Sequence, residues 1–126
     1  MLDVPSPVQL GKLGEVVARR ELERRGYAVL ATRYRSRYGE IDIVCDHDGV
    51  VVFVEVKARK SSRFGDAAET IPSRKRRRIA AMALDYLAWT NRLEHPCRFD
   101  VVAIDGLGTG RVTVRVIENA FQIDRS

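Results

Sequence analysis

Two segments of the sequence show the hydrophobic spacing of an amphipathic helix. The first begins at Ser6-Pro7, a capping residue followed by a proline suited to the first helical position, and we expect it to end at Gly26. The second begins with Ser73 as the expected N-cap and extends to about Asn91. The apolar residues that define the two helices are Leu10, Leu13, Val17, Ala18 and Leu22, and then Ile79, Ala83, Tyr86 and Leu87.

Five further segments have the composition or the alternation of strands. The segment from Val50 to Ala58 is almost continuously apolar, which predicts burial on both faces of a sheet. Asp48-Gly49 precedes it and favours a two-residue hairpin turn. The expected strands are Tyr27–Tyr34, Gly39–Cys45, Val50–Ala58, Arg98–Ile104 and Arg111–Ile117. The order α-β-β-β-α-β-β predicts a single α/β domain over residues 1–126, with helices flanking a central mixed sheet.

Composition narrows the classes of protein that this sequence can belong to. The 126 residues carry 22 Lys and Arg against 17 Asp and Glu, a formal charge of +5. No apolar run approaches the roughly 20 residues of a membrane helix, and no basic region followed by an apolar stretch opens the chain. Cys45 and Cys97 lie too far apart in sequence for a zinc motif. We therefore expect a cytoplasmic protein without a membrane partner.

The positive charge is concentrated in clusters, which favours a nucleic-acid partner. The run from Arg74 to Arg78 occupies the first turns of the second helix, where the helix dipole disfavours cations. A bound polyanion would compensate this arrangement, although a locally unfavourable helix end is the simpler alternative. The residues that we expect to contact nucleic acid are Arg59, Lys60, Arg74, Lys75, Arg76, Arg77 and Arg78.

Acidic residues recur where the two strands of the expected hairpin would meet. If Asp48-Gly49 forms the turn, Asp42 lies opposite Glu55 and Glu40 lies opposite Lys57, with all four side chains on one face. Opposed carboxylates repel each other, and a divalent cation such as Mg²⁺ would relieve that repulsion. Lys57 would then hold the attacking water or stabilise the scissile phosphate. A metal-free charge network is the alternative.

A third acid is expected from the first helix. Glu15 lies at the margin of its apolar stripe and could reach the edge of the sheet. Glu21 lies closer to the centre of the stripe, and wheel geometry does not decide between the two.

Several of these motifs together resemble a known protein family. The chain is similar, from about Gly11 to Ile104, to the YraN-type family of small bacterial proteins. That family is similar to archaeal Holliday-junction resolvases among the PD-(D/E)xK, or restriction-endonuclease-like, nucleases. The motifs that carry the resemblance are Gly11-x-x-Gly14-Glu15-x-x-Ala18, Gly39-Glu40-Ile41-Asp42, Val54-Glu55-Val56-Lys57, Phe64-Gly65 and Arg98-Phe99-Asp100-Val101.

The resemblance implies a restriction-endonuclease-like core over about residues 11–117. It implies that Glu15, Asp42 and Glu55 bind Mg²⁺ or Mn²⁺, and that these acids and Lys57 form the catalytic set. Lys75 would supply a further basic group. The expected activity is hydrolysis of phosphodiester bonds in DNA, including branched or structured DNA. A scaffold or nucleic-acid-binding domain without catalysis is the alternative, and an RNA substrate is not distinguished from DNA.

We also have expectations for residues outside the catalytic set. Asp100 matches a position that we interpret as structural, pairing with a nearby arginine. Junction-cleaving relatives of this fold act as homodimers, so a homodimer is implied. Tyr86 and Trp89 would form either an exposed apolar patch or part of the core. His47 and His95 fall between expected strands, and we expect both at the surface.

Overall fold

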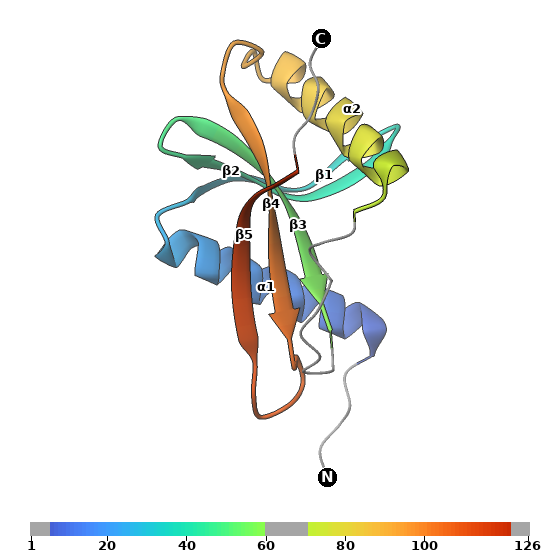
Figure 1. Ribbon diagram of the computed structural model, residues 1–126, viewed down its shortest axis with the longest axis vertical. Coiled ribbons are helices and arrows are strands. Elements are labelled where there is room, and N and C mark those ends of the chain that lie inside the picture. Colours follow the sequence, from blue (N-terminus) through green and yellow to red (C-terminus); the bar gives the residue numbers. More distant parts are fainter. Residues whose placement is uncertain (1–5, 60–70, 122–126) are drawn as a thin grey trace.

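A five-stranded mixed sheet with one helix on each face makes up the fold (Figure 1). The computed structural model describes residues 6–59 and 71–121. The elements are α1 (Pro7–Arg24), β1 (Ala28–Ser36), β2 (Gly39–His47), β3 (Val50–Ala58), α2 (Ser73–Trp89), β4 (Cys97–Asp105) and β5 (Thr113–Phe121). The strands lie in the order β1-β2-β3-β4-β5, and only β3 and β4 run parallel. The expected order of elements and the mixed sheet are confirmed.

The two helices begin differently. In α1, Ser6 forms a capping box with Gln9, because each side chain pairs with the backbone N–H of the other at 2.8–3.2 Å. In α2, Pro72 is the N-cap and no side chain caps the helix. The prediction that Ser73 caps α2 is therefore wrong, since Ser73 is already its first helical residue. The uncapped amides lie in the same turns as the arginine run.

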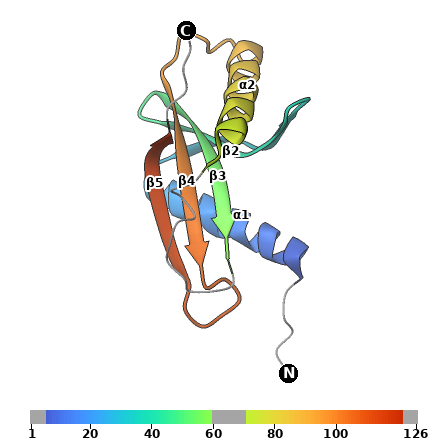
Figure 2. The ribbon, with the colours of Figure 1, turned by 45° about the vertical axis from the view of Figure 1, so that its right-hand side comes forward.

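The β2–β3 hairpin follows the register that its turn predicts. Asp48 and Gly49 both have positive φ angles, 54° and 85°, as a two-residue type I′ turn requires. Pairing then proceeds from His47 opposite Val50 to Ile43 opposite Val54. β2 also pairs with β1, and Figure 2 shows the closed end of the β1–β2 hairpin projecting away from the rest of the sheet. β2 therefore parts from β3 close to the acidic residues.

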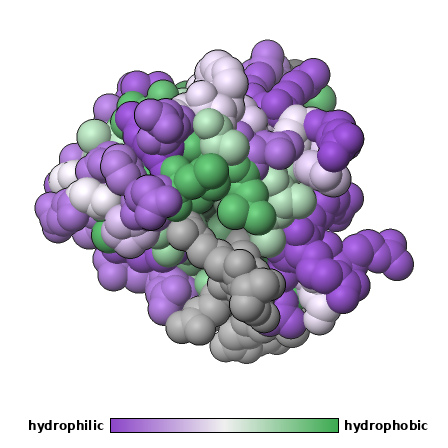
Figure 3. All heavy atoms as spheres, turned by 90° about the horizontal axis from the view of Figure 1, so that it is seen from above, coloured by the Kyte–Doolittle hydropathy of each residue, from purple (hydrophilic) through white to green (hydrophobic). Residues whose placement is uncertain are grey.

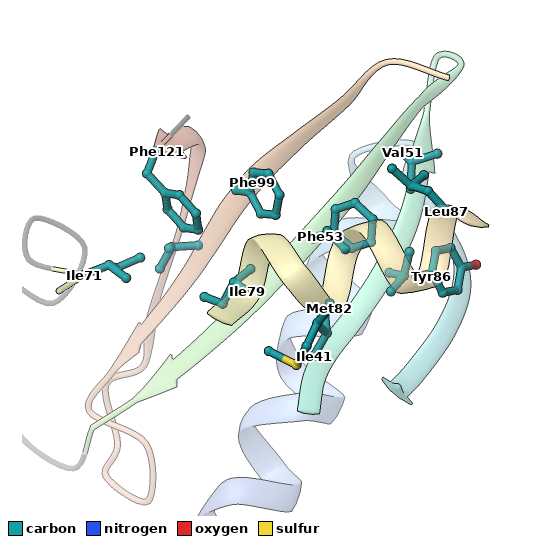
Figure 4. Packing of buried hydrophobic residues seen from close by; sticks show 13 residues of the cluster. Ile41, Val51, Phe53, Ile71, Ile79, Met82, Tyr86, Leu87, Phe99 and Phe121 are labelled. Carbon is teal, nitrogen blue, oxygen red and sulfur yellow. The ribbon is translucent and has the colours of Figure 1, made fainter. Parts of the chain in front are cut away.

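Each face of the sheet has its own hydrophobic cluster. Under α2, the rings of Phe53, Phe99 and Phe121 stack in sequence with centroids 5.4 and 4.8 Å apart (Figure 4). On the other face, Ala18 and Leu22 of α1 are fully buried against the strands. Burial of both faces explains why β3 is almost continuously apolar.

The close approach of α1 to β3 depends on a glycine. A Cβ atom added at Gly14 would lie 3.0 Å from the Cβ atom of Ala58, closer than real side chains normally pack. Gly14 therefore lets the first half of α1 lie directly on the end of β3. This contact fixes the position of the neighbouring Glu15 relative to the sheet.

On the face shown in Figure 3, a hydrophobic area lies near the centre, and mostly hydrophilic residues lie to either side of it. Across the described ranges, neither helix is long and apolar enough to cross a bilayer.

Candidate metal and nucleic-acid site

Three carboxylates from two elements meet beside the start of α1. Oxygen atoms of Glu15, Glu40 and Asp42 all lie within 4.8 Å of one another, and all three residues are partly buried. Glu15 and Asp42 line an open cleft of about 370 Å³ between α1 and the diverging strands. Its other lining residues are Leu10, Gly11, Val56 and Ala58. The structure therefore brings Glu15 and Asp42 together as expected, and it adds Glu40.

Asp42 reaches this cleft because the alternation of β2 is interrupted. Ile41 packs in the cluster under α2, whereas Ile43 packs in the cluster under α1. Regular alternation would place these two isoleucines on one face of the sheet, so the strand is irregular between them. Past the last regular pair, the Asp42 carboxylate accepts the backbone N–H of Val56 at 2.8 Å. That side-chain hydrogen bond holds Asp42 against β3 on the α1 side of the sheet.

The environment of Asp42 favours its protonated form. Its pKa is raised from 3.8 to about 6, chiefly because burial removes water from the charged carboxylate. The hydrogen bond from Val56 opposes this shift, and the negative charges of Glu55, Glu15 and Glu40 add to it. A buried carboxylate among other acids is a group that a cation would stabilise.

The other two acids of the group already have cationic partners. Glu15 is bound by Arg33 at 2.8 Å and Glu40 by Arg35 at 3.1 Å. Both arginines are well exposed, so water screens these ion pairs and they contribute little to stability. An incoming cation could therefore displace the two arginines from the glutamates at a small cost in free energy, and an incoming phosphate could bind the same arginines.

The structure distinguishes Glu15 from its rival on α1. Glu21 binds Arg25 at 2.7 Å and also pairs with Arg24, and these bonds lower its pKa to about 2. Glu21 does not line the cleft. The glutamate placed beside Asp42 is therefore Glu15.

Glu55 and Lys57 extend from β3 toward α2. Glu55 forms an ion pair with Lys75, the third residue of α2. The expectation that Asp42 and Glu55 present their carboxylates on one face is therefore wrong, although Glu55 has the largest charge effect on the pKa of Asp42. The pKa of Lys57 is lowered by burial and then by the charge of Lys75. Lys57 is thus easier to deprotonate than an ordinary surface lysine.

The basic residues expected to contact nucleic acid lie on two elements. Four of them are exposed at the start of α2, namely Arg74, Arg76, Arg77 and Arg78. Arg59 directly follows β3, where its N–H donates to the carbonyl of Ile104 at 2.8 Å. Lys60 lies outside the described residues, as does the Phe64-Gly65 pair. The cations of α2 that remain exposed form a surface around the uncapped helix end.

A second polar cluster lies within the sheet. Asp100 is 1% exposed and accepts hydrogen bonds from the Tyr27 hydroxyl at 2.9 Å and from Arg98 at 3.1 Å. His47 stacks on the Tyr27 ring with centroids 4.0 Å apart, and its Nδ1 lies 2.8 Å from Arg98. The arginine partner expected for Asp100 is present. The expectation that His47 lies in a surface loop is wrong, because it ends β2 within this cluster.

The cleft is chemically suited to a hard divalent cation. Carboxylate oxygens are the ligands that Mg²⁺ prefers, and two ligands across one such ion lie about 4 Å apart. The three acids need only a small movement to reach that spacing, since their oxygens already lie within 4.8 Å. Asp42, Glu15 and Glu40 could therefore hold an ion after that movement and a rearrangement of the exposed Arg33 and Arg35, whereas Glu55 would first have to release Lys75.

Comparison with known proteins identifies the family. A model described as "Uncharacterised protein family UPF0102" matches residues 14–104. A UPF0102 protein of Symbiobacterium thermophilum is 42% identical over 113 residues, covering 90% of this chain and 96% of that protein. A UPF0102 protein of Roseiflexus castenholzii is 47% identical over 116 residues, covering 90% of this chain and 94% of its own length. The chain therefore belongs to the UPF0102 family, the YraN-type family that its motifs resemble.

Proposed function

We propose that this protein is a cytoplasmic, metal-dependent endonuclease that hydrolyses phosphodiester bonds in DNA, including branched or structured DNA. Asp42 is the central metal ligand in this proposal, and Glu15 and Glu40 stand beside it. The observation that carries the proposal is the environment of the Asp42 carboxylate. Its carboxylate is partly buried among acids, has a pKa of about 6 and forms no ion pair within the described part of the chain.

The chain's own residues have distinct roles in the proposed reaction. A bound Mg²⁺ or Mn²⁺ would polarise the phosphodiester and lower the pKa of a water molecule. Lys57, whose own pKa is lowered, stabilises charge on the phosphate or orients the water. Glu55 keeps Lys75 near the site and becomes a further ligand only after releasing it. The exposed arginines of α2 hold the DNA backbone.

The proposal is tested by cleavage of plasmid and four-way-junction DNA with Mg²⁺, with Mn²⁺ and with a chelator. Asp42→Asn and Lys57→Ala should each abolish metal-dependent cleavage. Glu21→Gln is the matched control, because Glu21 is an acid of α1 outside the cleft. Equal residual cleavage in Asp42→Asn and the wild type would identify a contaminating nuclease and contradict the proposal.

A second candidate function is nucleic-acid binding without catalysis. The Glu55–Lys75 ion pair favours it, since one carboxylate of the expected ligand set already has a cationic partner. Calorimetric titration with Mn²⁺ separates the two candidates. Heat of binding that disappears in Asp42→Asn supports the nuclease, whereas no heat at millimolar Mn²⁺ supports the binding domain.

A further inference from the structure

The last residue of α2 presents an open aromatic surface. Trp89 is the only tryptophan in the sequence and is 76% exposed, whereas Tyr86, one turn earlier, is 3% exposed and belongs to the core. The Tyr34 ring lies beside the indole, with centroids 6.2 Å apart and ring planes 30° from parallel. Tyr34 therefore supports the indole from one side while most of its surface remains open to solvent.

One cation near this end of α2 is Arg37, whose charge interacts with that of Asp85. Arg37 lies over the Tyr38 ring, 4.9 Å from its centroid, on the chain segment that follows β1. Asp85, one turn before Trp89 on α2, is a nearby acid that would oppose an anion. Arg37 partly offsets the charge of Asp85, so the main attraction for a negatively charged partner comes from the arginines at the start of α2.

Helix α2 joins the aromatic group to the arginine cluster. Its 17 residues extend about 25 Å at 1.5 Å per residue. The exposed residues of α2 are Ser73, Arg74, Arg76, Arg77 and Arg78 at its start and Leu84, Asp85, Ala88 and Trp89 toward its end. At about 3.4 Å per nucleotide, one strand of roughly seven nucleotides spans that length.

We propose that Trp89 stacks on an unpaired base of a nucleic-acid strand whose phosphates are bound by the arginines at the start of α2. The inference rests on the nucleic-acid partner of the proposed function and adds its substrate class, a single-stranded segment. Aromatic side chains beside a basic track bind single strands in this way, because every base has a face on which to stack. A base within a duplex is already covered on both faces and offers no such surface.

A second copy of this chain is the competing occupant. Leu84 and Leu93 are 42% and 51% exposed, so apolar surface is present near the end of α2. The centre of a protein interface is depleted of charged residues, however, and here Asp85 is exposed one turn from the indole. One exposed aromatic group on the same helix as an exposed arginine cluster fits a nucleic-acid strand better than a self-complementary apolar face.

The single tryptophan makes the test direct, because tryptophan fluorescence, excited selectively over that of the four tyrosines, reports on Trp89 alone. The full chain in chelator is titrated with a 20-nucleotide oligothymidylate, a blunt 20-base-pair duplex and inorganic polyphosphate. The oligothymidylate should quench the fluorescence strongly, and polyphosphate should not. By anisotropy with labelled DNA, Trp89→Leu should weaken oligothymidylate binding about tenfold and duplex binding less than twofold. Trp89→Phe should retain most of the affinity, and Leu84→Ala serves as the exposed apolar control.

Three results would overturn the inference, and each is distinguishable from failure of the proposed function. Equal affinity of Trp89→Leu and the wild type for oligothymidylate rules out the stacking interaction, even if duplex DNA still binds and is cleaved. Equal quenching by polyphosphate assigns the signal to charge alone. A dimer in sedimentation that Trp89→Leu converts to a monomer, with oligothymidylate affinity unchanged, assigns the surface to a second copy. Absence of binding to every nucleic acid instead rejects the nucleic-acid partner itself.

Discussion

The Asp42 carboxylate accepts a hydrogen bond from Val56 on the α1 side of the sheet, whereas the Glu55 carboxylate binds Lys75 on the α2 side. Both residues belong to one hairpin whose register is regular up to Ile43 and Val54. The two acids are thus separated where β2 leaves β3, yet the charge of Glu55 still raises the pKa of Asp42. This arrangement places an unneutralised carboxylate in the cleft and predicts a measurable cost to the metal-free protein.

Asp42→Asn should stabilise the metal-free protein at neutral pH. The pKa of Asp42 is about 6 in the folded protein, against an ordinary value of 3.8. Asp42 therefore stays protonated to a higher pH in the folded protein than in the unfolded chain. The folded protein then binds more protons between these pH values, so its free energy of unfolding falls by up to about 3 kcal/mol as the pH rises from about 4 to 6. Asparagine avoids this decrease and can still accept the Val56 N–H.

Urea unfolding in chelator at pH 4 and at pH 7 measures the effect. The advantage of Asp42→Asn over the wild type should be small at pH 4 and about 1–3 kcal/mol at pH 7. Asp85→Asn, at an exposed position of α2, should change the free energy by less than about 0.5 kcal/mol. An Asp42→Asn protein that is less stable than the wild type at pH 7 would contradict this account of the site.

Breaking the Glu55–Lys75 ion pair should lower the free energy of unfolding, and the size of the decrease should depend on which residue is replaced. Lys75→Met leaves Glu55 charged, partly buried and without its cation, and should cost about 1–2 kcal/mol of stability. Glu55→Gln also removes a charge that repels Asp42, so its cost should be smaller. A double-mutant cycle by urea unfolding at pH 7 should give a coupling energy of about 1 kcal/mol. Strictly additive effects would show that the pair does not form in solution.

The backbone of this fold follows closely from local sequence signals. The bounds of β3 match the expected Val50–Ala58, and the Asp48-Gly49 turn sets the observed register. These features depend on turn chemistry and on the period of apolar residues, both of which act over a few positions. The cap of α2 is one local exception, because proline at the N-cap leaves Ser73 inside the helix. The last strand is another, since β5 spans Thr113–Phe121 and not the expected Arg111–Ile117.

The side-chain arrangement of the site depends on contacts between distant segments. Strict alternation places Asp42 beside Glu55, and no local signal marks the interruption between Ile41 and Ile43. The Glu55–Lys75 pair joins residues 20 positions apart, across a crossover connection. Such contacts arise from how the elements pack, so the sequence identifies the site residues more readily than their partners.

Two glycines of α1 should respond in opposite ways to alanine. At Gly14 the added Cβ would approach Ala58 at 3.0 Å in a buried contact, so Gly14→Ala should cost about 1–3 kcal/mol. At Gly11 no atom lies within 4 Å of the added Cβ, and Gly11→Ala should stabilise the helix by about 0.5–1 kcal/mol. Urea unfolding of both variants at one pH provides the comparison. Equal effects would mean that α1 does not rest on β3 through Gly14.

The arginines at the start of α2 should account for much of the salt dependence of DNA binding. Removing one cation that binds a phosphate should reduce the slope of log affinity against log salt by about 0.9 for duplex DNA. We expect Arg74→Ala and Arg77→Ala to lower the slope by about one unit each. Arg24→Ala is a suitable control, since Arg24 lies at the end of α1 and pairs with Glu21. Fluorescence anisotropy between 50 and 200 mM salt measures these slopes, and a change with Arg24→Ala of equal size would indicate only a general effect of net charge.

The buried Asp100 should stabilise the sheet without taking part in the proposed reaction. Its carboxylate accepts hydrogen bonds from Tyr27, Arg98 and the backbone N–H of Asn119, and so connects β4 to the start of β1 and to β5. Asp100→Ala leaves the partly buried Arg98 with only its longer ionic contact to Glu118, at 3.9 Å, and should cost about 3–5 kcal/mol. Tyr27→Phe removes the hydroxyl that donates to Asp100 and accepts from Arg98, and should cost about 1–2 kcal/mol.

Tyr27→Phe is the informative variant because it should remain folded. Thermal unfolding should show a lower midpoint, whereas Mn²⁺ binding and metal-dependent cleavage at 25 °C should equal those of the wild type. This outcome follows because Tyr27 bonds to Asp100 and stacks on His47, and none of the three lines the cleft at Asp42. A Tyr27→Phe protein with wild-type stability but reduced cleavage would instead make this cluster part of the reacting site.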